Sequence, residues 1–313
     1  DSVPAHLDLV VHPAEEHERT VITPFREIAG PVPPSGTENG VVRHDGLVGE
    51  VGSPPVAIHH RFACDPQFTH ARFVDTLEEG GVFAWVPTLT GVSRQSIFTG
   101  DPPFYFSTSL KSTSKEPNHW RRFWEDAGAA KVEVGYACQK KQEDDAAYLE
   151  RVRELAEHPK CRALGVVVGT VDQTIHGSVM GSSGLLASVK HWSDSGAPGN
   201  LVSLLLGEGF EVFITSDHGN VESTGMGKPN VGAIADERGE RAHVFRDDLT
   251  RAGAHVKYPT SIIWPQVGLP DTYRALLAPG RRAFIHEGKR TLAHGGISLE
   301  EVIVPFARVR ERA

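Results

Sequence analysis

The chain has 313 residues, of which 39% are hydrophobic and 23% are charged, and its formal net charge is −8. A chain of this length holds one large α/β domain or two smaller ones, and it buries about 75% of its unfolded surface without disulfide staples. The acidic balance argues against a general nucleic-acid coat protein, because such proteins carry a basic stripe.

Cysteine usage and hydropathy indicate the cellular compartment and whether the chain associates with a membrane. Cys64, Cys138 and Cys161 are scattered and form no C-x-x-C pair. They indicate neither a disulfide framework nor a thiolate zinc site, so we expect a reducing compartment, the cytoplasm. No apolar run approaches the ~20 residues of a membrane helix, and we expect no membrane association. The first residue is Asp1 rather than Met, which is consistent with a fragment of a longer protein.

The N-terminal part of the sequence predicts little regular structure. Residues 28–36 are dense in proline and glycine, and residues 41–47 run from β-branched residues into Asp45-Gly46. This last pattern fits a strand end, and it fits a plain Asp-Gly turn at least as well. We therefore divide the chain into an irregular segment, residues 1–80, which could carry the first strand of the core, and a core of regular elements, residues 81–313.

The first clear element is the apolar run at residues 81–86, as expected of a strand that is buried on both faces of a parallel sheet. The next residues, 87–100, predict a strand end, a turn and then a helix that ends at Gly100. Thr90 or Ser93 would cap this helix, and a hydroxyl there lies beside free backbone N–H groups that attract phosphate. On this segment alone, plain helix capping is the simpler interpretation.

Two further apolar strands lead into residues that can bind a metal. The strand predicted at residues 164–171 is followed directly by Asp172. His176 lies four positions after Asp172, on the same face of a helical turn. Another strand leads into Asp217 and His218, a carboxylate beside an imidazole. Ligands of open α/β sheets bind at the carboxyl ends of strands, and these donors suit Zn²⁺ or a similar divalent ion. Taken alone, each pair is better explained as a cap or a turn with an incidental histidine, and its position at the end of a strand is what favours a metal.

Amphipathic helices are expected between the strands. One carries Trp120, Phe123 and Trp124 on a single face, a stripe that we interpret as core rather than as a base-stacking platform. The predicted helices cover residues 116–127, 144–158, 182–195 and 200–208. This alternation of strand and helix predicts an α/β fold with a mostly parallel sheet and helices on both faces.

A glycine-rich, charged stretch follows at residues 221–248, and it predicts a surface excursion over the site. We assign its charges to a solvated face, although Arg238 or Arg241 could reach a phosphate. Near the end of the sequence, His294 precedes two glycines, which allow close backbone approach. Residues 298–301 resemble a capping box.

The last predicted strand covers residues 302–306. It contains Pro305, which lacks a backbone N–H. Proline therefore predicts an edge strand or a bulge at this position.

Together the motifs resemble a known superfamily. In chain order they are Pro-Thr-x-Thr before a helix, Asp-x-x-x-His, Asp-His-Gly and a late His-Gly-Gly, and three of them directly follow a predicted strand. This order resembles the alkaline phosphatase superfamily, which includes nucleotide pyrophosphatase-type phosphodiesterases and cofactor-independent phosphoglycerate mutase. Within it, the sequence is most similar to the PglZ domain of BREX phage-defence systems, over roughly residues 80–308.

The resemblance implies an alkaline-phosphatase-like fold, a threonine nucleophile and two divalent metal ions, for which zinc is the expected element. One ion would be held by Asp172, His176 and His294. The other would be held by Asp217, His218, the nucleophile and an earlier aspartate.

The resemblance also assigns the remaining roles. Thr90 matches the nucleophile best, because it is the fourth residue of Pro-Thr-x-Thr, and Thr88 is the alternative. The earlier aspartate would be Asp45, which has the Asp-Gly form, or Asp1. The residues after Asp45 do not resemble the expected helix, so the second metal position stays open. Arg94, one turn after Thr90, would stabilise phosphoryl oxygens, unless it only forms a surface salt bridge.

The implied activity is that of a metal-dependent phosphodiesterase or phosphatase in bacterial anti-phage defence. Its substrate would be a phosphoester such as a nucleotide or oligonucleotide, and its partners would be other defence-system proteins. The alternative is a degenerate domain that acts as an interaction module of a defence complex, which the irregular N-terminal part favours. A phosphotransferase like the mutase matches less well, because the long insertion expected after the nucleophile is not evident.

Overall fold

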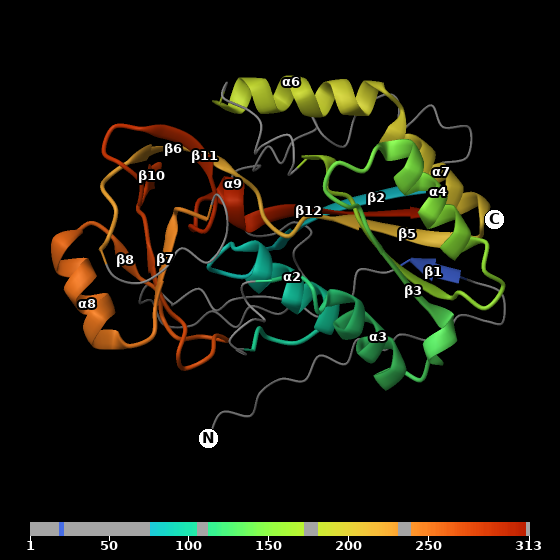
Figure 1. Cartoon of the computed structure of the whole chain (residues 1–313), viewed down its shortest axis with the longest axis horizontal. Helices are drawn as coiled ribbons and strands as arrows, with labels where there is room; N and C mark the ends of the chain where they lie inside the picture. The colour runs from blue at the N-terminus through green and yellow to red at the C-terminus, as the bar shows by residue number, and fades with distance from the viewer. Residues whose placement is uncertain (1–18, 22–75, 105–111, 172–180, 231–238, 311–313) are drawn as a thin grey trace, which may run out of the picture.

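The computed structural model describes residues 19–21, 76–104, 112–171, 181–230 and 239–310 (Figure 1). Three predicted site residues, Asp45, Asp172 and His176, lie outside these ranges. Asp1 and Arg238 also lie outside them.

A six-stranded sheet forms the centre of the molecule, with the strand order β2-β12-β5-β1-β4-β3. Its strands are β1 (Arg19–Val21), β2 (Thr76–Phe83), β3 (Val134–Cys138), β4 (Ala163–Val167), β5 (Phe210–Thr215) and β12 (Ile303–Arg310). Strands β1, β3, β4 and β5 pair in parallel, whereas β12 runs antiparallel to both β5 and β2. Strand β1 therefore lies in the interior of the sheet, although it is far from its neighbours in sequence.

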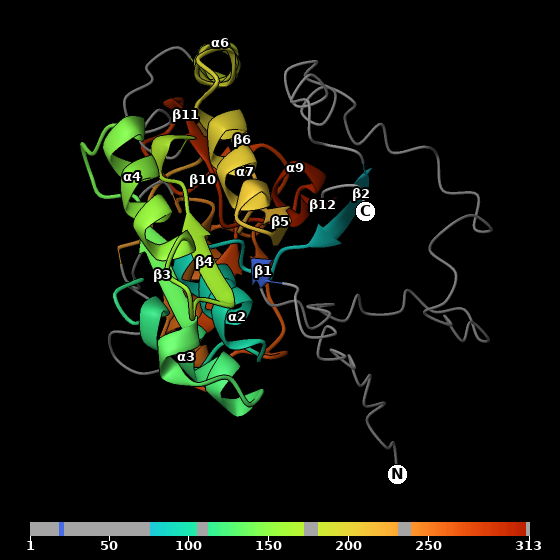
Figure 2. The same ribbon diagram turned by 90° about the vertical axis from the view of Figure 1, so that its right-hand side faces the viewer.

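Helices cover both faces of this sheet, as the two views together show (Figure 2). One face carries α2 (Thr90–Thr99) and α3 (Glu116–Asp126), and the other carries α4 (Asp145–Ala156) and α7 (Ala197–Gly207). Neighbouring residues of β4 show the division: Ala163 packs with Phe98 and Trp120, whereas Leu164 packs with Val152 and Leu205. Side chains of a strand alternate between the two faces, so each face has its own hydrophobic core.

Two smaller sheets extend the molecule beyond one end of the main sheet (Figure 1). Their strands are β6 (Val221–Gly225), β10 (Arg282–Ala283) and β11 (Arg290–Ala293), and β7 (Ala242–Phe245), β8 (Ile262–Ile263) and β9 (Arg274–Leu277). The remaining helices are α6 (Gly181–Asp194), α8 (Asp248–Lys257), α9 (Leu299–Val302) and the 3₁₀ helix η2 (Lys131–Glu133). Residues 221–248, predicted to be a surface excursion, thus contribute β6 and β7, so this prediction was wrong for the described part of the stretch.

The α/β class is confirmed, but a mostly parallel sheet is not. Of the strand pairings that the structure describes, four are parallel and five are antiparallel. The prediction for residues 81–86 was also wrong, because β2 pairs only with β12 among the described strands and Phe83 is 51% exposed. The exposed side chain of Phe83 and the antiparallel pairing with β12 show that this strand is not buried on both faces of a parallel sheet.

Pro305 lies in an interior strand rather than at an edge. Strand β12 pairs with β2 opposite Gly81 at this position, while its pairing with β5 begins one residue later, at Phe306. The missing N–H therefore falls where the β5 ladder has not yet begun, and the Pro305 carbonyl accepts a hydrogen bond from the Thr215 hydroxyl (2.9 Å). Within the described ranges, no helix has the length and apolar character needed to cross a membrane.

Candidate active site at the carboxyl end of β5

Three segments meet at one edge of the main sheet. Because β12 is antiparallel to its neighbours, its first residues lie where β2 and β5 end, with Ile303 opposite Phe83. The connection after β2 leads to Thr90, the connection after β5 carries Asp217 and His218, and the loop between β11 and α9 carries His294. The sheet topology therefore brings together residues that are up to about 200 positions apart in sequence.

Thr90 and His218 form a hydroxyl–imidazole pair. The Oγ1 atom of Thr90 lies 3.0 Å from Nε2 of His218, and Nδ1 of His218 lies 3.0 Å from the Gly219 carbonyl oxygen. A carbonyl oxygen can only accept, so Nδ1 carries the proton and Nε2 presents its lone pair to the Thr90 hydroxyl. This orientation fixes the hydroxyl of the predicted nucleophile in one position.

Asp217 and His294 complete the arrangement around His218. One carboxylate oxygen of Asp217 accepts the backbone N–H of His218 (3.1 Å), and the other lies 3.6 Å from Nε2 of His218. The imidazole of His294 stacks on that of His218, with ring centroids 3.8 Å apart and an interplanar angle of 15°. Nδ1 of His294 donates to the Thr88 carbonyl oxygen (2.9 Å), which leaves the lone pair on Nε2. Both imidazoles are buried.

The two candidate threonines occupy different environments. Thr88 is fully buried, and its hydroxyl donates to the Gly296 carbonyl (3.0 Å) and accepts from the Gly295 N–H (3.0 Å). Thr88 therefore ties the His294 loop to the turn before α2. Thr90 is half-buried and points its hydroxyl at His218, so the geometry favours Thr90 as the nucleophile.

The expected capping of α2 by a hydroxyl was wrong. The helix begins at Thr90, its N-cap is Leu89, and the cap makes no side-chain hydrogen bond. Ser93 is buried inside the helix. The Thr90 hydroxyl is consequently available to His218, and the uncapped N–H groups at the start of α2 lie beside the site. The predicted end of the helix at Gly100 is confirmed by its φ of 68°.

Glycines let the three segments approach closely. A Cβ atom at Gly219 would lie 1.8 Å from the Glu300 carbonyl oxygen, and the Gly219 N–H donates to the Glu301 carbonyl (3.1 Å). Gly295 has a φ of 106°, which favours glycine. The close approach predicted for the glycines after His294 is thus present.

A buried ion pair supports the His294 loop from behind. Nε of Arg241 donates to Oε1 of Glu301 (2.8 Å), and both side chains are at most 1% exposed. Glu301 also accepts the Gly296 N–H (2.7 Å) and the Ser298 N–H (3.0 Å) and hydroxyl (2.7 Å). The assignment of Arg241 to a solvated face was therefore wrong. The sequence signal for Glu301 was the capping box, which the structure confirms.

Arg94 forms a salt bridge that is buried rather than on the surface. Its Nη2 atom contacts Oε2 of Glu116 (2.5 Å), and the Tyr136 hydroxyl donates to the same oxygen (2.6 Å). Burial lowers the pKa of Arg94, but the carboxylates of Glu116 and Asp217 raise it more, so that the pKa lies above its ordinary value. The effect of Asp217 places this carboxylate within electrostatic reach of the guanidinium. Sequence analysis missed Glu116 and Tyr136.

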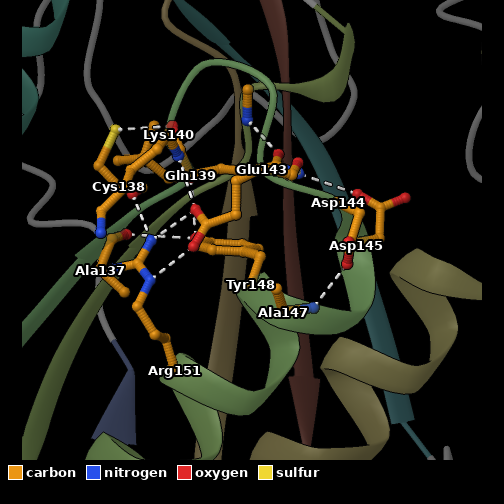
Figure 3. Close-up of polar contacts among 12 residues, drawn as sticks. Ala137, Cys138, Gln139, Lys140, Glu143, Asp144, Asp145, Ala147, Tyr148 and Arg151 are labelled. Carbon is orange, nitrogen blue, oxygen red and sulfur yellow. Dashed lines mark hydrogen bonds and ion pairs between the residues drawn. The ribbon is translucent and has the colours of Figure 1, made fainter.

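A polar network orders the loops after β3 and β4, and Figure 3 shows its part around the loop after β3 and the start of α4. Oε1 of Gln139 accepts the Gly169 and Thr170 N–H groups (2.9 and 3.1 Å), and Oδ1 of Asp145 accepts from Gln139 (2.9 Å) and the Thr170 hydroxyl (2.9 Å). Nε1 of Trp192 donates to the other Asp145 oxygen (3.0 Å). The chain that leads to position 172 is therefore held in place up to Thr170.

The donor types at this edge fit a divalent metal. Asp217, His218 and His294 supply the oxygen and nitrogen ligands that zinc binds, and each imidazole donates its Nδ1–H to a backbone carbonyl, as metal-binding histidines commonly do. No group of three or more His, Cys, Asp or Glu able to hold a metal occurs within the described residues. The remaining predicted ligands, Asp172, His176 and Asp45, lie outside them.

The α/β fold is that of an alkaline-phosphatase-like domain, a class whose members usually use divalent metals. A family model described as "BREX system PglZ alkaline phosphatase-like domain" matches residues 69–309. The chain therefore belongs to the PglZ family. No curated protein matches the sequence.

Solved structures of similar fold include three of ectonucleotide pyrophosphatase/phosphodiesterase 5. The murine protein, as an inactive variant in complex with AMP, is 11% identical with a TM-score of 0.47, and 72% of this chain and 74% of that chain are covered. A second murine structure is 13% identical with a TM-score of 0.47 and coverages of 73% and 75%. The human protein is 12% identical with a TM-score of 0.45 and coverages of 72% and 75%.

Proposed function

We propose that this chain is a metal-dependent phosphoester hydrolase, a phosphodiesterase or phosphatase with Thr90 as its nucleophile. The observation that carries the proposal is the contact of the Thr90 hydroxyl with His218, whose ring stacks on His294 at the carboxyl edge of the sheet. Membership of the PglZ family supports phosphoester chemistry and a role in bacterial anti-phage defence. We further propose a cytoplasmic location and association with other defence-system proteins.

Two divalent ions, with zinc as the expected element, would bind at this edge. The residues that would hold them are Asp172, His176 and His294 for one ion, and Asp217, His218, Thr90 and either Asp45 or Asp1 for the other. When bound, such ions supply Lewis-acid charge that neutralises phosphoryl oxygens and increases the acidity of a hydroxyl or a water.

The residues of the chain determine the geometry of the transfer. Oγ1 of Thr90 lies 3.0 Å from Nε2 of His218, whose ring is held by the Gly219 carbonyl, so the hydroxyl and the imidazole could bind the same ion. Oγ1 attacks phosphorus, and the Oγ1–P bond forms while the bond to the departing alcohol breaks. The uncapped N–H groups at the start of α2 and the Arg94 guanidinium stabilise the phosphoryl oxygens. Water then cleaves the phosphothreonine and restores Thr90.

The preferred substrate is a diester with a nucleotide or oligonucleotide leaving group. The net charge of −8 disfavours tight binding to long duplex DNA by this chain alone, because DNA-binding surfaces need excess positive charge. A short single strand or another small nucleotide diester therefore suits the chain better than a duplex.

The second candidate function is a catalytically degenerate interaction module of a defence complex. It is favoured by the sequence after Asp45, which does not resemble the helix expected of the family, so that the second metal position stays open. This candidate predicts that partner binding is unaffected by Thr90→Ala and that no ester is hydrolysed.

The experiment that tests the proposal is the metal content of the purified chain by mass spectrometry, together with hydrolysis of a panel of mono- and diesters. We expect two equivalents of zinc in the wild type, falling in both Asp217→Ala and Asp172→Ala. Asp271→Ala, at an exposed loop position, is the matched control and should keep full metal content. Absence of bound metal after zinc is supplied would overturn the hydrolase proposal and favour the interaction module.

A further inference from the structure

We infer that Glu116 and Tyr136 are positioning residues that hold the Arg94 guanidinium at the candidate active site. The inference rests on the proposed function, in which Arg94 stabilises the transferred phosphoryl group. The three side chains come from different elements, α2, α3 and β3, and they meet on the face of the main sheet that α2 and α3 cover.

The direction of Arg94 follows from its place in α2. Arg94 lies one turn after Thr90 on the same helix face, and side chains of an α-helix lean toward its N-terminus. The guanidinium is therefore directed to the end of the helix where Thr90 meets His218. The influence of Asp217 on the charge of Arg94 agrees with this direction, because Asp217 lies at that end.

Glu116 is a fixed anchor rather than a mobile counter-ion. Its side chain is 3% exposed, and it occupies the first turn of α3, where the helix dipole favours a carboxylate. Trp120, one turn later, is fully buried and contacts Phe98 of α2 edge-on, so α3 is locked against α2. The Tyr136 hydroxyl fixes Oε2 of Glu116 from the side of the sheet.

The hydrogen bonding of Glu116 is one-sided. Its Oε2 atom receives both Arg94 and Tyr136, whereas its Oε1 atom is buried and has no hydrogen-bond partner among the described residues. A carboxylate placed only for stability would be expected to use both oxygens. The observed arrangement instead fixes the position of one Arg94 nitrogen. A guanidinium has five N–H donors, so others are left for the oxygens of a phosphoryl group.

Such an anchor matters because Arg94 is long and otherwise flexible. Holding the guanidinium before substrate binds removes the need to order it in the transition state, and a misplacement of about 1 Å can lower a rate about 100-fold. Loss of the anchor should therefore act mainly on kcat, through Arg94, and less on KM.

The test uses the full chain loaded with zinc and bis(p-nitrophenyl) phosphate as substrate. We expect Glu116→Gln to lower kcat/KM about tenfold to 100-fold, and Tyr136→Phe to lower it less, since either change loosens the guanidinium. In the Arg94→Ala background the same Glu116→Gln change should have less than about a twofold further effect, because the two residues act as one unit. Glu125→Gln, an exposed position on α3, is the matched control and should leave kcat/KM unchanged.

Melting temperatures separate positioning from folding. The inference would be wrong if Glu116→Gln lowered kcat/KM by the same factor with and without Arg94. It would also be wrong if Glu116→Gln lowered the melting temperature and left turnover unchanged. Neither result would contradict the proposed hydrolase function. A wild type that hydrolyses no ester would contradict the proposed function instead. In that case, binding of inorganic phosphate to the zinc-loaded chain, measured by calorimetry, tests whether Glu116 positions Arg94. Weaker binding in both Arg94→Ala and Glu116→Gln would support the inference. Unchanged affinity in Glu116→Gln would overturn it.

Discussion

Thr88 and Thr90 are two positions apart, yet they differ in what their hydroxyl groups do. The Thr88 hydroxyl makes two hydrogen bonds inside the protein, to Gly295 and Gly296, whereas the Thr90 hydroxyl contacts His218 alone among the described residues. A substitution that keeps the shape and removes the hydroxyl separates the two roles. Valine is such a replacement.

We predict opposite outcomes for Thr88→Val and Thr90→Val. Thr88→Val should lower the free energy of unfolding by about 1–3 kcal/mol, because the buried Gly295 N–H loses its acceptor. Thr90→Val should unfold like the wild type but lose turnover by at least about 1000-fold, since a nucleophile has no substitute. Urea unfolding followed by circular dichroism and initial rates measure the two effects. If both variants lost activity equally and neither lost stability, the assignment of Thr90 as the nucleophile would be wrong.

Glu143 illustrates a charge whose effect depends on pH. Both its oxygens accept from Arg151 (2.8 and 2.7 Å), and these hydrogen bonds, with one from the Lys140 N–H, lower its pKa from 4.5 to about 2 (Figure 3). The folded state thus binds this proton less readily than the unfolded state. The stabilisation is therefore fully present above about pH 4.5 and is lost as the pH falls toward 2.

We accordingly predict that Glu143→Gln lowers the free energy of unfolding by about 1 kcal/mol at pH 7, a size typical of a well-formed surface pair. The difference from the wild type should shrink as the pH falls from 4.5 to 2. Urea unfolding at a series of pH values measures it. Glu150→Gln, in the more exposed pair with Arg153, is the control with little effect. If the difference in unfolding free energy between Glu143→Gln and the wild type grew as the pH fell, the lowered pKa of Glu143 would be contradicted.

The segment from β11 to β12 depends on one interior ion pair. Arg241 and Glu301 join β7 to the loop of His294, and the next residue back, Glu300, forms only an exposed pair with Arg281. Neighbouring glutamates therefore provide a matched comparison of a buried and an exposed carboxylate on the same short helix.

We predict that Glu301→Gln destabilises the protein by about 3 kcal/mol, because the Arg241 charge is left buried without a counter-ion. Glu300→Gln should cost less than about 1 kcal/mol. Chemical unfolding of the two variants tests the difference. Similar values for both would mean that the ion pair contributes nothing specific to the His294 loop.

The loop after β5 needs glycine at position 219. An alanine there would place Cβ 1.8 Å from the Glu300 carbonyl oxygen, so either this loop or the start of α9 must move. We predict that Gly219→Ala lowers stability by about 1–3 kcal/mol and reduces zinc binding, because His218 moves with the loop. Gly253→Ala on α8, where no atom lies within 4 Å, should instead stabilise slightly. Unfolding and metal analysis of the two variants check the contrast, and wild-type metal content in Gly219→Ala would contradict it.

Sequence patterns predicted helices and strand ends correctly where neighbouring residues in the sequence determine the structure. The helices at residues 116–127 and 144–158 were expected, and α3 and α4 occupy Glu116–Asp126 and Asp145–Ala156. Strand ends before Thr90 and Asp217 were visible because each apolar run stops at polar residues. The edge position of β2 and the interior position of Pro305 could not be predicted from local patterns, because both depend on strand partners more than 80 residues away.

The same limit applies to the candidate site. Thr90, Asp217, His218 and His294 were identified because motifs mark them, and the structure brings all four together. The supports of the site were missed. Glu116 is tied to Arg94 22 residues away and Glu301 to Arg241 60 residues away, and no local pattern encodes such a pairing.

At the scale of the whole molecule, β1 comes from the N-terminal segment, which we expected could carry the first strand of the core. Residues 19–21 pair with both β4 and β5 at the centre of the sheet, although the family match begins only at residue 69. The division of the chain at residue 81 remains a prediction. The N-terminal part nevertheless supplies a strand on which the continuity of the sheet depends.

We predict that a fragment of residues 69–313 is less stable than the full chain and prone to aggregate, because removal of β1 leaves the facing edges of β4 and β5 unpaired. A fragment of residues 19–313, which keeps β1, is the control. Thermal unfolding and light scattering compare the two. Equal stability of both fragments would show that β1 is dispensable.

The reversed strand β12 also determines when the site can exist. It is inserted between β2 and β5 and follows every other described strand in chain order. During synthesis, Thr90 and Asp217 therefore emerge on two parts of a sheet that only β12 joins, and His294 arrives just before it. A nascent or prematurely terminated chain holds the reactive hydroxyl apart from its partners. The hydrolase proposed above would therefore gain its complete site only after translation has passed β12.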